Sequence, residues 1–325
     1  MIKKVLVLLV LSALVFTVIG CDGNGAGGNS DAIRVGIVQM IDNGAFTDMR
    51  EGFIGRLREL GFDENSLVID YRNAHGDAGT LHSICQAMVS ARMDVVVTIA
   101  TPPTQAFVNM QSDIPNFFIS VSNPIQAGVI SDLAHPDMNS TGTSNLIPVD
   151  ELFALADLLT PGIQTFGIIH SAAEINSVQT AESAMAFLDA NGINHRQAVV
   201  TSSSEVHQAA LSLVGNVDAI FVPNDSIVQN AMAQVAQVAM EHGIPIYGSS
   251  AVMVESGAFA TISIDDYTIG AMTADMVARY LGGTPIEEIP AVVVSDFTMV
   301  INTATASALG IELPQDVLDS AVLIG

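Results

Sequence analysis

Short apolar runs alternate with amphipathic stretches along the chain from Ile33 onward. Two of the stretches repeat apolar residues every three or four positions, which predicts helices at residues 47–60 and 80–92. The runs between them are short and rich in β-branched residues, which predicts buried strands at residues 33–40, 66–71, 94–100 and 116–121. Strands that alternate with helices of this length predict βαβ units and a parallel sheet.

The same rhythm restarts in the second half, with strands predicted at residues 166–171, 195–201, 218–223 and 244–250. The halves also share a segment: DVVVTIATPPTQA (94–106) aligns with DAIFVPNDSIVQN (218–230). This alignment places Asp94 over Asp218 and Thr101 over Asp225. The sequence therefore predicts an α/β fold of two similar, doubly wound parallel-sheet lobes.

Two later segments predict that the chain crosses between the lobes more than once. Residues 260–283 have the pattern of a strand, a turn and a long helix that ends at glycines. Residues 291–302 form an extended run long enough to leave one lobe and enter the other. We expect one lobe to comprise residues 33–145 and about 266–297, and the second to comprise residues 146–265 and about 298–325.

The N-terminus has the pattern of an export signal. The basic MIKK precedes an apolar run at residues 5–19, which is too short for a comfortable membrane span. Gly20 and Cys21 then resemble the lipobox of bacterial lipoproteins, which predicts a signal peptide at residues 1–20 and a lipid on Cys21. The alternative is an ordinary signal peptide with a chance cysteine. The Gly-, Ser- and Asn-rich residues 21–32 predict a flexible tether, and hence an extracytoplasmic protein anchored to the cell membrane.

The net charge, the cysteine count and the missing enzyme motifs limit the classes of function that the sequence supports. The chain has 34 acidic residues against 10 Lys and Arg, a formal net charge of −24. Such a surface repels nucleic acid and anionic membranes, so we expect membrane contact through the lipid anchor only. Only one cysteine besides Cys21 exists, the helical Cys85, so no disulfide, metal site or cofactor is expected. The nucleophile, zinc and phosphate-loop motifs GxSxG, HExxH and GxxxxGK[ST] are missing, which argues against an enzyme.

Polar residues gather instead at the predicted strand ends. In open parallel sheets, ligands bind beyond the carboxyl ends of the strands, and two facing lobes would bring both sets of ends to one cleft. Any Ser, Thr or Asn there could equally cap a helix. The predicted ligand-binding residues are Gln39, Phe46, Thr101, Ser122, Asn123, Asn176, Ser177, Asp225, Ser249 and Asp265.

The chemistry of these residues indicates a zwitterionic ligand. Thr101 and Ser177 stand at predicted helix starts, where hydroxyl and backbone N–H groups attract a carboxylate. Asp225, and next Asp265, would hold an ammonium group. An α-amino acid carries both groups. The absence of Trp and the presence of only four Tyr argue against a sugar site, and Phe46 suits an aromatic or other apolar side chain.

Several segments, in order from Ile33 to about Leu313, resemble one family: REGFIGRLRELGF, IATPPTQA, SAAEINSVQ, DAIFVPNDS and ATISIDDYTIG among them. They are similar to the substrate-binding lipoproteins of ABC importers in the tryptophan and tyrosine group. The resemblance implies a type I periplasmic-binding fold, with three crossovers between two lobes that close on a ligand. It also implies a monomer that delivers an amino acid to a permease and its ATPase. By position, the family's cleft would include Thr101, Ser122, Asn176, Ser177, Asp225 and Asp265.

Two alternatives remain open at this point. The same fold could serve a ligand-sensing receptor that feeds a kinase or chemoreceptor, and a lipoprotein enzyme is the second. The sequence argues against a sugar-responsive repressor, because residues 1–32 have the pattern of an anchor where a DNA-binding headpiece would stand.

Overall fold

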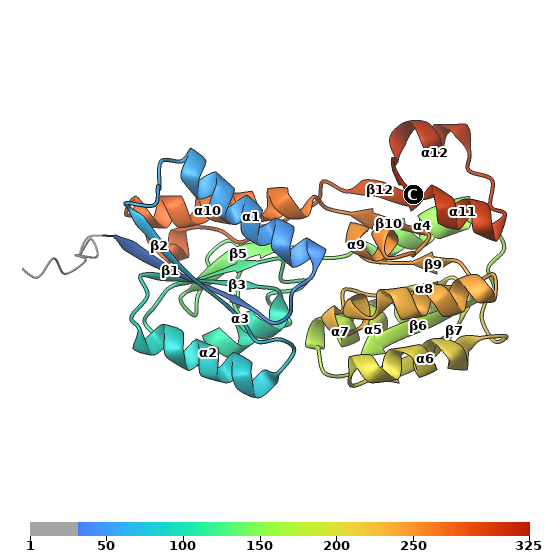
Figure 1. Ribbon diagram of the computed structural model, residues 1–325, viewed down its shortest axis with the longest axis horizontal. Helices are drawn as coiled ribbons and strands as arrows, with labels where there is room; N and C mark the ends of the chain where they lie inside the picture. The colour runs from blue at the N-terminus through green and yellow to red at the C-terminus, as the bar shows by residue number, and fades with distance from the viewer. Residues whose placement is uncertain (1–31) are drawn as a thin grey trace, which may run out of the picture.

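The computed structural model describes residues 32–325. The predicted signal peptide, Cys21 and all but the last residue of the predicted tether therefore lie outside the described residues. Within residues 32–325, no helix has both the length and the apolar character needed to cross a membrane. These residues form two lobes side by side, each with a central sheet covered by helices on both faces (Figure 1).

Lobe I contains a parallel sheet with the strand order β11-β5-β4-β3-β1-β2. Helices α1 and α10 pack on one face, and α2 and α3 on the other. The elements are β1 (Ile33–Gln39), α1 (Gly44–Glu59), β2 (Leu67–Asn73), α2 (Ala78–Ser90), β3 (Val95–Ile99), α3 (Thr101–Val108), β4 (Asn116–Ile119), β5 (Ser140–Ser144), α10 (Asp266–Leu281) and β11 (Val292–Val293).

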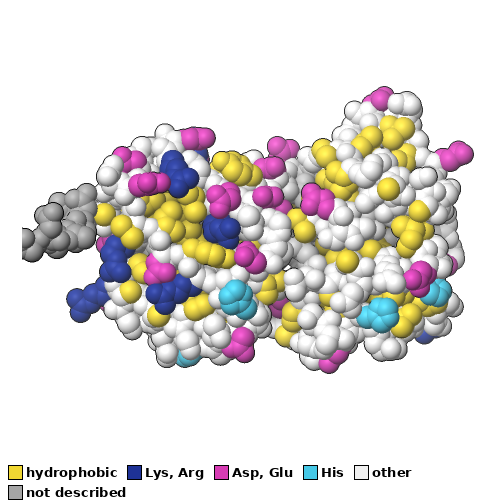
Figure 2. All heavy atoms as spheres, viewed as in Figure 1, with side chains coloured by type: hydrophobic (Ala, Val, Ile, Leu, Met, Phe, Trp, Pro, Cys, Tyr) yellow, Lys and Arg dark blue, Asp and Glu magenta, His cyan; other side chains and the backbone are white. Residues whose placement is uncertain are grey.

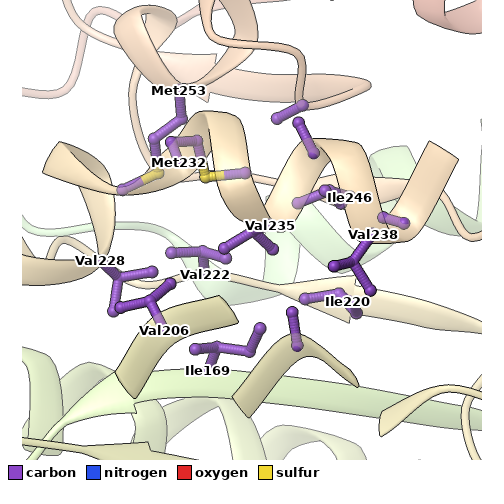
Figure 3. Packing of buried hydrophobic residues seen from close by; sticks show 14 of the residues in the cluster. Ile169, Val206, Ile220, Val222, Val228, Met232, Val235, Val238, Ile246 and Met253 are labelled. Atoms are coloured by element: carbon purple, nitrogen blue, oxygen red, sulfur yellow. The ribbon is translucent and has the colours of Figure 1, made fainter. Parts of the chain in front are cut away.

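Lobe II contains a sheet with the order β13-β12-β10-β9-β8-β6-β7. Its elements are α4 (Val149–Leu159), β6 (Thr165–Ser171), α5 (Ile175–Ala190), β7 (Asn194–Val200), α6 (Val206–Leu213), β8 (Ala219–Phe221), α7 (Ser226–Asn230), α8 (Met232–Glu241), β9 (Ile246–Tyr247), α9 (Ala251–Glu255), β10 (Ala260–Ser263), β12 (Thr298–Asn302), α11 (Thr303–Leu309), α12 (Gln315–Ser320) and β13 (Val322–Ile324). The core below α6 and α8 consists of close-packed aliphatic side chains (Figure 3).

The α/β prediction is confirmed, with one departure from purely parallel sheets. Strand β12 runs antiparallel to β10. The cause lies in the crossovers: in residues 32–325 the chain passes between the sheets after β5, after β10 and after β11. The last passage enters lobe II at the end where the parallel strands finish, so the entering strand must run against them.

The two aligned halves share one structural feature, an aspartate before a strand that accepts hydrogen bonds from the start of the neighbouring strand. Asp94 stands before β3, and its Oδ2 accepts a hydrogen bond of 2.7 Å from the N–H of Arg34 at the start of β1. Asp218 stands before β8, and its Oδ2 accepts hydrogen bonds of 2.9 Å from the N–H groups of Gln164 and Thr165 at the start of β6. Each aspartate thus links two neighbouring strands of its sheet at their starts.

Helices α1 and α10 lie side by side on lobe I and touch through glycines (Figure 1). A Cβ on Gly52 would lie 2.0 Å from the carbonyl oxygen of Tyr267, and a Cβ on Gly270 would lie 2.0 Å from that of Met49. Gly52 thus contacts Tyr267, which stands three positions before Gly270, and Gly270 contacts Met49, which stands three positions before Gly52. These two contacts bring the helix backbones close together at residues 49–52 of α1 and 267–270 of α10.

We predict that Gly52→Ala lowers the free energy of unfolding by about 2–3 kcal/mol, because the new methyl group must push two backbones apart. Gly55→Ala, one turn later on α1, is the control: its Cβ would meet only the hydroxyl end of Tyr267, a side chain that is half exposed. Urea unfolding of both variants measures the difference. Equal stability of the two variants would contradict the backbone contact.

Candidate ligand-binding site

The ends of both sheets meet at a cleft between the lobes. Its empty volume is about 450 Å³, open solvent at the mouth included. The wall from lobe I and the crossovers consists of Ala45, Phe46, Met49, Ala100, Thr101, Ser120, Ser122, Asn145 and Asp266, and the wall from lobe II consists of Glu174, Asn176, Asn224, Asp225, Ser226, Gln229 and Ser250.

The lobe I wall presents a buried hydroxyl that has no partner. Thr101 begins α3 and is 1% exposed, and its Oγ1 makes no hydrogen bond within the described residues. The backbone beside it is strained, because Ala100 and Ser120 have φ angles of 72° and 63°. Non-glycine residues in this region persist where the surrounding structure imposes them, and they concentrate at functional sites.

On the lobe II wall, the carboxylate of Asp225 is held rigidly. Asp225 is the N-cap of α7, and its Oδ1 accepts a hydrogen bond of 2.9 Å from the N–H of Val228. Its Oδ2 accepts hydrogen bonds of 2.5 Å from the N–H of Ser171 and from the hydroxyl of Ser177. Burial raises the pKa of Asp225, although the hydrogen bonds from Ser177, Val228 and Ser171 lower it.

Glu174 forms an acidic pair with Asp225. Its carboxylate accepts hydrogen bonds from the hydroxyl of Ser226 and, at 3.1 Å, from the N–H of Ser226. Burial, and next the negative charge of Asp225, raise the pKa of Glu174 to about 7. None of the described residues that line the cleft is Lys, Arg or His, so the pair has no cation beside it.

Asp266, the first residue of α10, brings a third carboxyl group to the cleft from the second crossover. It has no hydrogen bond or ion pair with any other described residue. Burial, followed by the charges of Asp48, Asp265 and Glu255, raises its pKa to about 7.

The surface around the cleft is also short of positive charge. Of the eight arginines, all of them in the described part of the chain, seven lie in lobe I and only Arg196 lies in lobe II. Most arginine side chains visible in Figure 2 accordingly lie over lobe I, whereas carboxylates spread over both lobes. Arg50, one of three arginines on α1, is turned toward Asp42 and lies 4.3 Å above the ring of Tyr71.

Asn176 supplies a second buried atom without a partner. Its Nδ2 donates a hydrogen bond of 2.8 Å to the carbonyl oxygen of Asn224, and its Oδ1 has no partner among the described residues. The Nδ2 of Asn224 in turn donates to Oδ1 of Asn145, on the first crossover, at 2.6 Å. Hydrogen bonds therefore fix the orientation of Asn176, which leaves one acceptor for a ligand.

Five of the ten residues predicted from sequence lie in the cleft lining, from both lobes: Phe46, Thr101, Ser122, Asn176 and Asp225. Two others lie immediately beside it. Ser177 is fully buried behind Asp225 and orients its carboxylate. Asn123 lines an adjoining groove, where its side chain accepts a hydrogen bond of 3.0 Å from the N–H of Gln126.

The remaining three predicted residues do not line the cleft, because each has a structural partner. Gln39 is fully buried, and its amide donates to the carbonyl oxygen of Ile41 at 2.6 Å. Ser249 donates to the carbonyl oxygen of Val222 at 2.8 Å. Asp265 is exposed and caps α10 through the N–H of Thr268, so its neighbour Asp266 enters the cleft instead.

Sequence reasoning missed several lining residues, above all Glu174 and Asp266. Both stand directly beside residues that were predicted, Glu174 two positions before Asn176 and Asp266 next to Asp265. The pattern of strand ends located the correct loops. At α10, the choice between Asp265 and Asp266 depends on which one caps the helix, and the sequence does not show this. Within residues 32–325, no group of His, Cys, Asp and Glu could hold a metal ion.

A pH dependence follows from Asp266. Its pKa is about 7 in the folded protein and has an ordinary value of 3.8, so between about pH 4 and 7 the folded chain holds a proton that the unfolded chain has lost. Stability therefore falls as pH rises through this window. We predict that Asp266→Asn is more stable than the wild type by about 1 kcal/mol at pH 8, and that the gap closes toward pH 4. Urea unfolding measures it, and a gap independent of pH would contradict the assignment.

Comparisons with known proteins agree with this geometry. A sequence model described as ABC transporter substrate binding protein matches residues 34–324. A tyrosine-binding protein of Clostridioides difficile is 32% identical over 321 residues, which cover 95% of this chain and 93% of that protein. A crystal structure from Streptococcus pneumoniae, described as an ABC domain in complex with L-Trp, is 30% identical with a TM-score of 0.87, and covers 90% of this chain and 100% of its own.

A third relative indicates how the lobes are arranged. The ligand-free, open structure of a substrate-binding protein with adhesive properties from Clostridium difficile is 31% identical, with a TM-score of 0.71 over 90% of this chain and 99% of that one. At nearly equal identity, the fold described above is therefore closer to the L-Trp complex than to the open form. The predicted type I periplasmic-binding fold is confirmed. The chain belongs to the family of ABC transporter substrate binding proteins.

Proposed function

We propose that this substrate-binding protein takes a free α-amino acid with an aromatic or other apolar side chain into the cleft and delivers it to the permease of an ABC importer. One observation carries the proposal. Two buried polar atoms without partners, Oγ1 of Thr101 and Oδ1 of Asn176, face one cleft from opposite lobes. A buried polar atom without a hydrogen bond costs free energy, which a ligand that supplies the bond would recover.

The charges around these atoms suit a zwitterion. The hydroxyl of Thr101 and the start of α3 attract a carboxylate, because a helix N-terminus carries partial positive charge. The pair of Asp225 and Glu174, with no cation among the described lining residues, attracts an ammonium group. Oδ1 of Asn176 can accept a hydrogen bond from the same group.

The remaining wall suits an apolar side chain. Ala45, Phe46 and Met49 on the first turns of α1 are almost completely buried and line the cleft. Relatives support this choice of ligand, since the protein from Clostridioides difficile is described as tyrosine-binding and the structure from Streptococcus pneumoniae contains L-Trp. The sequence-based preference for an aromatic or apolar amino acid rests on both observations.

A ligand held from both sides would stabilise the closed arrangement of the lobes. Direct contacts already join them: Gln179 of α5 donates to the carbonyl oxygen of Gln126 at 3.3 Å, and Val252 of α9 packs against the apolar cluster of lobe I. A bound ligand shifts the population toward closure only by its difference in affinity between the closed and open states. The permease would then recognise the closed form.

Proteins of this family are extracytoplasmic, and we propose that a lipid on Cys21 tethers this one to the membrane as a monomer. The permease and its ATPase are the proposed partners. No catalytic step is part of the proposal.

Thr101→Val tests the proposed site. Oγ1 of Thr101 makes no hydrogen bond within the protein, so without ligand the free energy of unfolding of the variant should equal or exceed that of the wild type. Its affinity for L-tryptophan or L-tyrosine should fall by roughly 10- to 100-fold, the loss of one hydrogen bond to a charged group. Titration calorimetry and urea unfolding measure the two effects.

The control is Thr104→Val, one turn later on α3. Thr104 does not line the cleft, and its Oγ1 already bonds to Thr98 at 2.9 Å and to the carbonyl oxygen of Ala100 at 2.8 Å. This variant should lose stability and keep its affinity. The proposal fails if the wild type binds none of the twenty amino acids, or if Thr101→Val binds as tightly as the wild type.

A further inference from the structure

We propose that Asp266 selects the ligand's side chain by accepting a hydrogen bond from an O–H or N–H group on it, so that the preferred ligands are aromatic amino acids with a ring-borne donor. This inference rests on the proposed function and specifies its substrate class. Asp266 was not among the predicted ligand-binding residues.

The packing of α1 against α10 places Asp266 beside the apolar wall of the cleft. Gly270 of α10 lies against the backbone of Met49 on α1, and Asp266 stands one turn before Gly270. Asp266 lines the same cleft as Phe46 and Met49, the two larger side chains of the apolar wall. A ligand side chain packed on this wall would therefore end near Asp266.

The carboxyl group of Asp266 has no structural task within the described residues. Asp265 caps α10, with its Oδ1 2.5 Å from the N–H of Thr268, whereas Asp266 makes no hydrogen bond or ion pair. Its charged neighbours Asp48, Asp265 and Glu255 are all acidic. A carboxyl group beside apolar residues and without partners is costly, which explains its raised pKa. A donor on the ligand would provide the missing partner.

The ligand's ammonium group is the other candidate for this partner, but a different pair of acids suits it better. Glu174 and Asp225 are fixed by hydrogen bonds from Ser226, Ser177 and Ser171, and both lie on lobe II. Asp266 enters from the second crossover with α10, which packs on lobe I. The two acidic groups therefore approach from opposite walls, as the two ends of an extended ligand would require.

The test compares ligand pairs that differ in the ring donor: L-tyrosine with L-phenylalanine, and L-tryptophan with 1-methyl-L-tryptophan, in which a methyl group replaces the N–H hydrogen. Titration calorimetry at pH 7.5 is carried out on the wild type, Asp266→Leu and Asp266→Asn. The leucine variant removes the acceptor at similar size, and the asparagine variant keeps an acceptor without charge. Asp48→Asn is the control, because it removes a nearby negative charge from an exposed residue that does not line the cleft.

The wild type and Asp48→Asn should prefer the donor-bearing member of each pair by at least about 10-fold. Asp266→Leu should reduce this ratio to near one while it keeps its affinity for L-phenylalanine, and Asp266→Asn should retain part of the preference. Binding of L-phenylalanine also reports that each variant is folded.

Three results would overturn the inference. An equal loss of affinity for all four ligands in Asp266→Leu would assign Asp266 to the ammonium group. An unchanged preference in this variant would remove Asp266 from recognition altogether. If the wild type binds L-phenylalanine and L-tyrosine equally, the ring donor is not recognised, although the proposed function stands. Only a wild type that binds none of the twenty amino acids would count against both the inference and the proposed function.

Discussion

One electrostatic constraint determines the properties of the cleft: a buried carboxyl group needs a nearby cation, hydrogen-bond donors or a bound proton. Asp225 and Glu174 are satisfied in part by the hydroxyl and N–H groups of Ser171, Ser177 and Ser226. No described lining residue supplies a positive charge, and burial, followed by the negative charge of Asp225, raises the pKa of Glu174 to about 7. These carboxyl groups suit a cationic ligand group, which supports the proposed binding site more directly than the shape of the cleft does.

The fold delivers these groups through the direction of its strands. Parallel strands bring all their carboxyl ends to one edge of each sheet, and the three crossovers turn the two edges toward each other. The glycine contact between α1 and α10 then brings two helix starts to the same edge. A ligand in the cleft would touch both lobes, so its binding would favour the closed arrangement. The resemblance to the L-Trp complex, rather than to the open relative, agrees with a closed arrangement.

Much of the fold could be predicted from the sequence, because periodicity and strand ends are local patterns. The two lobes and the cleft residues Thr101, Asn176 and Asp225 follow from them. Three features could not be predicted. The antiparallel β12 depends on where the chain enters lobe II. The sequence predicts Asp265 as a ligand-binding residue, whereas Asp266 lines the cleft, because the outcome depends on which aspartate caps α10. The fully buried Gln39 looked like a ligand-binding residue at a strand end, but its amide holds the following loop.

The central claim is that opposite lobes recognise the two charges of an amino acid, the carboxylate at Thr101 and the ammonium at Asp225 and Glu174. The most direct measurement is calorimetric titration of the wild type with L-tryptophan, with tryptamine, which lacks the carboxylate, and with indole-3-propionate, which lacks the ammonium group. Each analogue should bind at least about 10- to 100-fold more weakly than the amino acid, because each leaves one set of buried groups without its partner. If either analogue binds as tightly as L-tryptophan, the zwitterion account is wrong.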